Sequence, residues 1–128
     1  MDSFPIRNNT RTGYLLAGEG DSVNCSYPNG KRRGRVGKGF AHTLTTTGCQ
    51  GTVSHGRIRR LTPRECLRLQ GFEETQIERA LAVNSDSQIY KQAGNSVTVN
   101  VVHAIGIRLK AMIEEDRSVN QTVEKYEA

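Results

Sequence analysis

The sequence of 128 residues lacks most signatures of secreted, metal-binding and membrane proteins. Its three cysteines form no Cys-x-x-Cys pair and its three histidines are scattered, so neither a disulfide framework nor a zinc site is predicted. No run reaches the 18 or more apolar residues of a membrane span, and the polar start lacks the regions of a signal peptide. Internal repeats and low-complexity tracts are absent as well. We therefore expect a soluble, cytoplasmic protein with reduced thiols.

Acidic residues are nearly missing from the middle of the chain. Residues 31–70 contain ten of the eighteen lysines and arginines but a single acid, Glu65. A polyanion such as nucleic acid is the natural partner of so basic a stretch. A solvated surface whose charges face in all directions is the alternative. The length allows one domain with a modest core.

The first 58 residues predict a β-rich lobe. Seven glycines within residues 1–39, set among Asn, Ser and Thr, favour loops and short strands over helix. The best candidate strands there are residues 13–17 and 23–27. Residues 40–58 are rich in Thr and Val and predict two short strands that meet at a turn around residues 48–51.

Residues 59–115 predict helices, followed by a polar tail over 116–128 that is expected to fray. Thr62, Pro63 and Glu65 form a helix start with a capping box, and this helix is expected to end near residues 70–71. Two short helices are expected over 75–82 and 86–92. A last helix is predicted over 97–115 from apolar residues that recur every four positions. These residues are Val97, Val101, Ile105, Leu109 and Ile113.

Two segments carry the most information about function. Residues 59–72 read RRLTPRECLRLQGF, and residues 90–97 read YKQAGNSV. In order and spacing they resemble the last two sequence blocks of DNA cytosine-5 methyltransferases. Residues 37–44 are similar to the part of that family's target recognition region that carries a Thr-Leu pair. The resemblance implies an α+β fragment of a larger α/β methyltransferase fold, with a recognition lobe at 1–58 and a helical carboxyl-terminal segment at 59–115.

The catalytic parts of that family are missing from this sequence. Methylation of cytosine carbon 5 needs a nucleophile, a contact to the ring nitrogen, a bound methyl donor and an extruded base. The family supplies the first three from Pro-Cys-Gln, Glu-Asn-Val and F-x-G-x-G motifs, and none of them occurs here. Cys49 shares Cys-Gln with the nucleophile motif but lies out of order, inside the recognition region. Cys66 is expected to be buried as a small apolar side chain. No catalytic residue is assigned.

The resemblance places DNA recognition in the β-rich lobe. Lys38 and the turn at 45–51 match loops that enter the major groove, where a lysine can donate to guanine and threonine hydroxyls can read neighbouring base edges. Three arginines are expected to meet phosphates. Arg60 and Arg64 are expected to tie the lobe to the core instead. The candidate DNA-binding residues are Lys38, Thr43, Thr45, Thr46, Thr47, Gly48, Gln50, Arg32, Arg33 and Arg35.

Asn95, Ser96 and Val97 match the family's turn that completes the wall of the S-adenosylmethionine pocket. A turn that opens a helix has free N–H groups suited to a polar ligand. A helix cap by Asn95 or Ser96 is the alternative, and both roles can hold together. Because the glycine-rich loop of the family is missing, we expect weak or no affinity for this cofactor from the chain alone.

The resemblance therefore predicts the carboxyl-terminal part of a DNA cytosine-5 methyltransferase, which binds double-stranded DNA but needs a separately encoded catalytic half. The apolar stripe of the last helix predicts association with that half, or self-association. One alternative is a stand-alone binding protein, such as a phage or mobile-element anti-defence inhibitor or DNA-binding factor. Its support is the Met1 start, the looser match of residues 1–36 and an acidic tail. A gene remnant without function is the other alternative.

Overall fold

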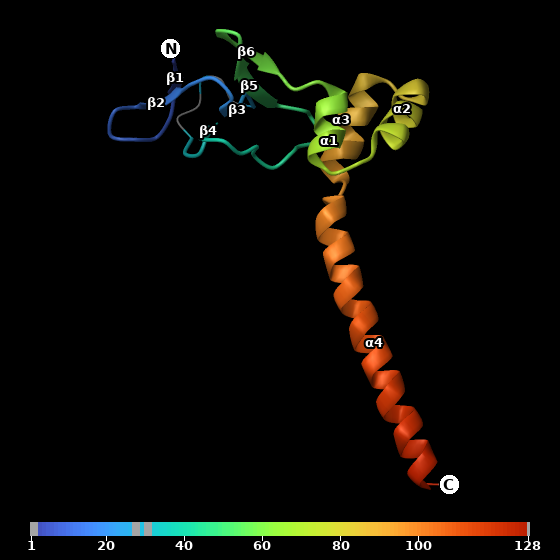
Figure 1. Ribbon diagram of the computed structural model, residues 1–128. Coiled ribbons are helices and arrows are strands. Elements are labelled where there is room, and N and C mark those ends of the chain that lie inside the picture. Colours follow the sequence, from blue (N-terminus) through green and yellow to red (C-terminus); the bar gives the residue numbers. More distant parts are fainter. Residues whose placement is uncertain (1–2, 27–28, 30–31, 128) are drawn as a thin grey trace. The chain divides into compact units, whose positions relative to one another are not determined.

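The computed structural model describes residues 3–26, 29 and 32–127 (Figure 1). Short antiparallel strands fill the first part of the chain and helices fill the rest, which confirms the predicted α+β class. The chain falls into two units, Met1–Ser96 and Val97–Ala128. The strands and the first three helices belong to the first unit, and the last helix belongs to the second.

Two strands near the amino terminus pair as an antiparallel hairpin. Strand β1 covers Phe4–Arg7 and strand β2 covers Tyr14–Ala17. The strand expected at residues 13–17 is therefore confirmed as β2, whereas β1 carries no pattern that predicts it. Gly13 precedes β2 with a positive φ of 78°, a conformation in which other residues would be strained.

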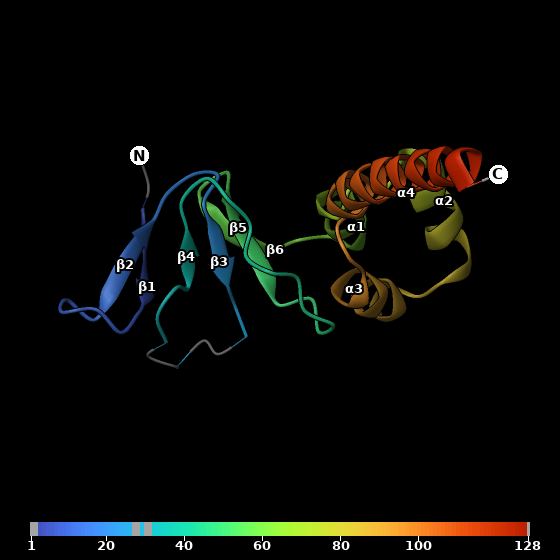
Figure 2. The same ribbon diagram turned by 90° about the horizontal axis from the view of Figure 1, so that it is seen from below.

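A four-stranded antiparallel sheet has the order β4-β3-β5-β6 (Figure 2). Its strands are β3 (Ser22–Asn24), β4 (Val36–Gly37), β5 (Gln50–Ser54) and β6 (Arg57–Arg60). The strand expected over residues 23–27 corresponds to β3, although Tyr27 lies outside the described residues. The two-residue strand β4 is too short for an alternating pattern, so the sequence does not predict it.

The prediction that two strands meet at a turn around residues 48–51 is wrong. Gln50 pairs with Asn24 in the ladder between β5 and β3, so the chain is already extended at that point. The turn between β5 and β6 lies at His55 and Gly56, whose φ values are 52° and 68°. Residues 40–49, all of them described, form no strand. Pairing with β3, a contact distant in sequence, decides where β5 begins.

Helix α1 (Pro63–Leu69) has the predicted capping box. The Thr62 hydroxyl accepts a hydrogen bond from the Glu65 N–H, and the Glu65 carboxylate accepts one from the Thr62 N–H at 2.8 Å. Helices α2 (Glu74–Val83) and α3 (Asp86–Asn95) confirm the two short helices that the sequence predicts.

Two apolar clusters form the core of the first unit. One lies within the β lobe and contains Ile6, Ala17, Val23, Val36 and Val53. The other contains Leu44, Cys66, Leu67, Ile77, Ile89 and Ala93. Within the second cluster, Leu44 alone comes from the loop between β4 and β5, and the others come from α1, α2 and α3. Leu44 therefore joins this loop to the helices, and burial of such a side chain contributes about 1.5–3 kcal/mol.

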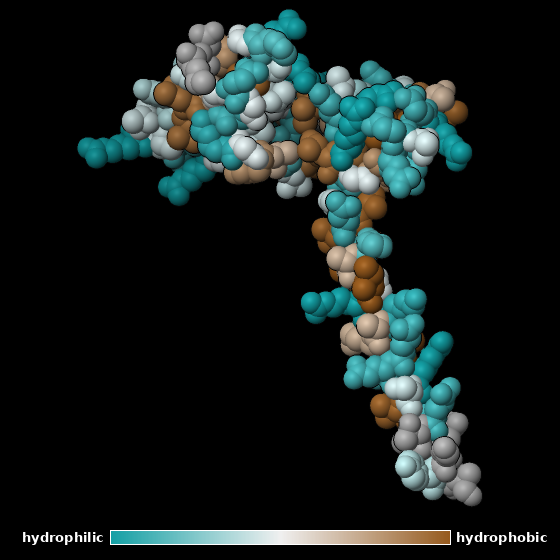
Figure 3. Space-filling view, viewed as in Figure 1, coloured by the Kyte–Doolittle hydropathy of each residue, from teal (hydrophilic) through white to brown (hydrophobic). Residues whose placement is uncertain are grey.

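Helix α4 covers Val99–Glu127. It begins later than residue 97 and continues past residue 115, so it includes most of the segment that the sequence predicts as a polar tail. Every α4 side chain that the structure describes is exposed, and Figure 3 shows apolar side chains along it in brown. Among the described residues, one helical stretch, Asp86–Gln121, which includes much of α4, is long and apolar enough to cross a membrane by length and composition alone. Arg108 and Lys110 interrupt its apolar stretch.

Candidate nucleic-acid interface

The loop at residues 44–48, called the reading loop below, contains three of the candidate DNA-binding threonines. It is exposed at its tip and buried at both ends. Thr45, Thr46 and Thr47 are exposed, whereas Leu44 and Gly48 on either side are buried. The Gly48 N–H donates to the Thr45 carbonyl at 3.0 Å and closes a tight turn. The three threonines thus present their side chains to solvent from a fixed base, which is the arrangement that direct reading of base edges requires.

Gln50 is buried, unlike this tip, whereas Thr43 is exposed. Gln50 is 1% exposed, and its side-chain amide donates to the Thr43 carbonyl at 3.2 Å. Its other side-chain atom, Oε1, is buried without a partner among the described residues. Contact between Gln50 and a base would require this part of the lobe to open, so the structure gives Gln50 a role in supporting the loop.

The three arginines expected to meet phosphates line one pocket of about 330 Å³. Arg32 and Arg33 are exposed, while Arg35 is 7% exposed. The Arg35 guanidinium donates to the Arg7 carbonyl at 3.1 Å and to the Asn24 carbonyl at 3.3 Å, so Arg35 also holds β1 and β3 together. The remaining lining residues are Asn24, Ser26 and Thr45. A threonine of the reading loop and three guanidinium groups therefore share one hollow.

Lys38 is exposed but engaged. Its ammonium forms an ion pair with the Asp21 carboxylate and donates to the Leu16 carbonyl at 2.7 Å. Asp21 is buried, and its carboxyl pKa is lowered. The hydrogen bond from Lys38 is the largest cause, and the hydrogen bond from the Gly18 N–H is the second. An ammonium has three donors, so one is left for a DNA acceptor.

Ion pairs join helix α1 to strand β6 and to helix α2. The Arg59 guanidinium donates to both carboxylate oxygens of Glu65 at 2.9 and 2.8 Å, which connects β6 to α1. This bond is the main reason that the pKa of Glu65 is lowered to about 2. Arg64 does not tie the lobe to the core as expected, because it donates to the Glu74 carboxylate of α2 at 2.8 Å.

Arg60 does hold the lobe, as the sequence predicts. Its Nε donates to the Gly48 carbonyl at 2.6 Å and its Nη2 donates to the Thr47 carbonyl at 2.7 Å. The same guanidinium lies 4.1 Å from the centre of the Tyr90 ring on α3. The sequence gives no role to Tyr90 or Gly94, since their partners lie 29 or more residues away. Only their place in the YKQAGNSV segment marks them.

The predicted cofactor turn does not open α4. Asn95 ends α3 and Ser96 caps that end, whereas α4 starts at Val99. The Ser96 N–H donates to the Gln92 carbonyl at 3.0 Å, and the Ser96 hydroxyl donates to the Ala93 carbonyl at 2.9 Å. Neither Asn95 nor Ser96 is an amino-terminal cap of α4. The N–H and the hydroxyl of Ser96 are thus both engaged within α3.

Cys66 and Cys49 have different surroundings. Cys66 is 2% exposed, as expected, and burial raises the pKa of its thiol, which disfavours the thiolate. Cys49 lies beside the reading loop, with its Sγ 3.0 Å from the Thr47 hydroxyl. Within residues 3–26, 29 and 32–127, no group of three or more His, Cys, Asp or Glu side chains could hold a metal ion.

Comparison with known proteins decides the family. The family model for C-5 cytosine-specific DNA methylases matches residues 4–111. The chain belongs to this family. Its members use S-adenosylmethionine and act on DNA.

The relatives are much longer than this chain. A type II methyltransferase of Lactococcus lactis subsp. cremoris, M1.ScrFI, is 30% identical over 138 residues, covering 88% of this chain and 34% of the relative. An orphan methyltransferase of Bacillus phage rho11s, M.Rho11sI, is 62% identical over 50 residues, or 38% of this chain and 10% of the relative. The type II methyltransferase M.HgiCI of Herpetosiphon aurantiacus is 52% identical over 56 residues, which cover 43% of this chain and 12% of the relative. No solved structure matches the chain.

Proposed function

We propose that this chain is the carboxyl-terminal, DNA-reading part of a cytosine-5 methyltransferase. By itself it binds double-stranded DNA and transfers no methyl group. The nucleophile and the main cofactor loop come from a separate catalytic polypeptide, which the chain meets through α4. S-adenosylmethionine supplies the methyl group in that assembled enzyme, and the residues of this chain choose and hold the DNA.

The β lobe supports the DNA-binding part of the proposal. The threonine tip at residues 45–47 is exposed and firmly based, and Thr45 shares its pocket with Arg32, Arg33 and Arg35. Guanidinium groups that share a pocket with a base-reading residue are well placed to bind the phosphates that flank the bases being read. We assign Arg32 and Arg33 to phosphates, Lys38 and Thr45–Thr47 to base edges, and Arg35 to both phosphate and the support of its pocket.

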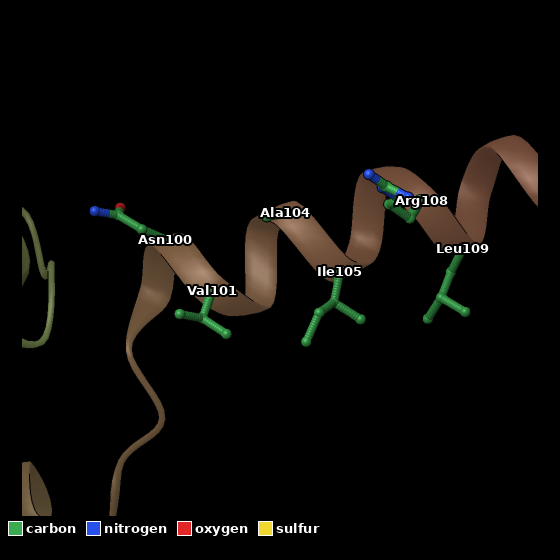
Figure 4. A pocket seen from close by; sticks show the side chains of 6 residues that line it. All are labelled: Asn100, Val101, Ala104, Ile105, Arg108 and Leu109. Carbon is green, nitrogen blue, oxygen red and sulfur yellow. The ribbon is translucent and has the colours of Figure 1, made fainter.

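The observation that carries the proposal is the uncovered apolar face of α4. Val101, Ile105 and Leu109 point to the same side of the helix and line one shallow hollow (Figure 4). Each of these side chains is at least 51% exposed. Soluble proteins rarely leave an apolar stripe of this length in water, so it marks a contact surface. The relative M1.ScrFI is about three times as long as the part this chain matches, which leaves a large catalytic portion to cover the stripe.

The test is methyl transfer in a mixture. The purified chain is combined with the part of M1.ScrFI that lies outside the matched region, and transfer of labelled methyl groups to duplex DNA is measured. We expect activity from the mixture and from neither component. The absence of activity with this and other catalytic halves, together with no association in sedimentation, would contradict the proposal.

A matched pair of variants locates the contact. Ile105→Asp places a charge in the middle of the apolar face, whereas Ile107→Asp places the same charge about half a turn around the helix. The two isoleucines are similarly exposed, at 54% and 57%. Ile105→Asp is expected to weaken association with the catalytic half at least about tenfold, because burying an unpaired carboxylate is costly, and Ile107→Asp is expected to change it little.

A further inference from the structure

The reading loop needs contacts that hold its threonine side chains in place. Thr45, Thr46 and Thr47 belong to no helix or strand, yet their side chains must keep one position to discriminate between bases. Loops generally open more easily than helices and strands. Whatever fixes the carbonyl groups of this loop therefore contributes to selectivity without touching DNA.

Arg60 bonds to two consecutive carbonyls of the loop. Its Nε and Nη2 atoms donate to Gly48 and Thr47 at 2.6 and 2.7 Å. A guanidinium presents such donors in one rigid plane, so two bonds formed together fix the direction of the peptide as well as its distance. A lysine keeps the charge but offers no planar pair of donors.

Tyr90 supports the other side of the same guanidinium. The ring centre lies 4.1 Å from the Arg60 Cζ atom, which is the geometry of a cation–π contact. The Tyr90 hydroxyl donates to the Leu61 carbonyl at 2.7 Å, so the ring itself is held against the residue after Arg60. Tyr90 is half-buried on α3, a helix with a fixed place in the core.

Two glycines allow the loop to approach so closely. A Cβ atom at Gly48 would lie 2.4 Å from the Tyr90 ring, and the φ of 61° there also disfavours other residues. A Cβ atom at Gly94 on α3 would lie 2.4 Å from the backbone of Thr45 and Thr46. The loop is thus in contact with α3 at both ends of its threonine tip.

We propose that Arg60 is a positioning residue for DNA recognition, which fixes the loop at residues 45–48 against Tyr90 of α3. This inference rests on the proposed function, since it explains how the reading loop stays selective. Arg60 acts through the loop carbonyls and does not contact DNA. Its substitution should therefore reduce the preference between DNA sequences while leaving the electrostatic attraction to DNA unchanged.

Cys49 provides a readout of the loop that does not depend on DNA. Its thiol is partly exposed beside Thr47, whereas the Cys66 thiol is buried in the helical core. The whole chain is treated with N-ethylmaleimide, and labelling of each cysteine is followed by mass spectrometry of its peptides. Arg60→Lys is expected to speed the labelling of Cys49 about tenfold, because two bonds from a charged donor are lost. The rate at Cys66 should stay unchanged.

Three control variants make this measurement specific. Arg57→Lys makes the same substitution on the same strand, at an exposed arginine, and should leave Cys49 unchanged. Tyr90→Phe keeps the ring and should change Cys49 labelling less than about twofold, while Tyr90→Leu removes the ring and should resemble Arg60→Lys. An unchanged Cys49 rate in Arg60→Lys, or equal acceleration at Cys49 and Cys66, would overturn the inference.

Selection from a pool of duplexes with a randomised centre tests the consequence for recognition. Arg60→Lys should lower the enrichment of the preferred sequences about tenfold and leave the salt dependence of binding as in the wild type. A wild-type chain that enriches no sequence would contradict the proposed function, whatever the labelling shows. A variant whose loop opens without any loss of enrichment would contradict the positioning role alone.

Discussion

Glu65 shows how much of the fold depends on one side chain. Its carboxylate accepts two hydrogen bonds from Arg59 on β6 and one from the Thr62 N–H at the start of α1. The same group thus caps a helix and joins that helix to the sheet. Among the causes that lower its pKa to about 2, the hydrogen bond from Arg59 is the largest, so the bond to the sheet is also the pH-sensitive one.

Glu65→Gln is expected to destabilise the chain by about 1–2 kcal/mol near pH 7, with allowance for a site that water partly screens. Glutamine still accepts the Thr62 hydrogen bond, so the substitution removes mainly the charge. Because the pKa of Glu65 is lowered from 4.5 to about 2, its contribution is complete above pH 4.5 and is lost as the pH falls toward 2. Urea unfolding at several pH values measures this.

The control at this scale is Glu114→Gln. Glu114 faces Lys110 at 3.8 Å on the exposed surface of α4. An exposed pair of this kind contributes less than about 0.5 kcal/mol, so the variant should unfold almost as the wild type does. A difference between Glu65→Gln and the wild type that persisted unchanged at pH 2 would show that the ion pair is not its origin.

At the scale of elements, two helical glycines have opposite roles. An added Cβ atom at Gly94 would lie 2.4 Å from backbone atoms of Thr45 and Thr46, whereas one at Gly106 in α4 would meet nothing within 4 Å. Gly94→Ala is therefore expected to cost about 1–3 kcal/mol as the loop is pushed from α3. Thermal unfolding followed by circular dichroism measures the change.

Gly106→Ala is the matched substitution for that experiment. Glycine is about 0.8–1.0 kcal/mol less favourable than alanine inside a helix, so this variant should increase the stability of α4. The same chemical change thus has opposite signs in two helices. A Gly94→Ala chain as stable as the wild type, with an unchanged rate of Cys49 labelling, would contradict the close contact between α3 and the loop.

Elements with local signals are the ones that the sequence predicts. The capping box at Thr62 and the four-residue repeat that begins at Val97 lie within one segment each, so α1 and most of α4 can be predicted from them. Strand β4 and the true turn at residues 55–56 depend on pairing with β3 and β5, which no local pattern contains.

Some residues of the candidate site can be predicted from the sequence, and others cannot. The threonine tip and the basic residues can be found from composition and from the family resemblance, because they are near one another in sequence. The contact of Arg60 with Tyr90 joins residues 30 positions apart, and Gln50 is buried because it lies in β5. Such roles follow from tertiary packing. They become visible only when the strands and helices are placed together.

At the scale of the whole molecule, the formal charge of +5 should attract any duplex, and individual side chains should then decide between sequences. Arg33→Ala is expected to weaken binding to all duplexes about equally and to reduce the magnitude of the salt slope by about one. Titration of several duplexes at a series of salt concentrations measures both effects.

Lys38→Ala is expected to reduce the preference among duplexes instead. This variant also leaves the buried Asp21 without its ion pair, so Asp21→Asn is the matched control, since it removes the pair and keeps the ammonium. Asp21→Asn should retain the preference that Lys38→Ala loses. Equal effects of Arg33→Ala and Lys38→Ala on every duplex would contradict the division between phosphate and base contacts.

The separation of an exposed threonine tip from the residues that hold it in place affects how such a protein can evolve. Substitutions at outward-facing positions usually change stability by less than about 0.5 kcal/mol. Residues 45–47 can therefore vary with little effect on folding, while Gly48, Arg60 and Gly94 preserve the scaffold. On the proposed function, a lineage can acquire a new target site by changing three neighbouring codons, and a laboratory library limited to those codons could seek new targets in the same way.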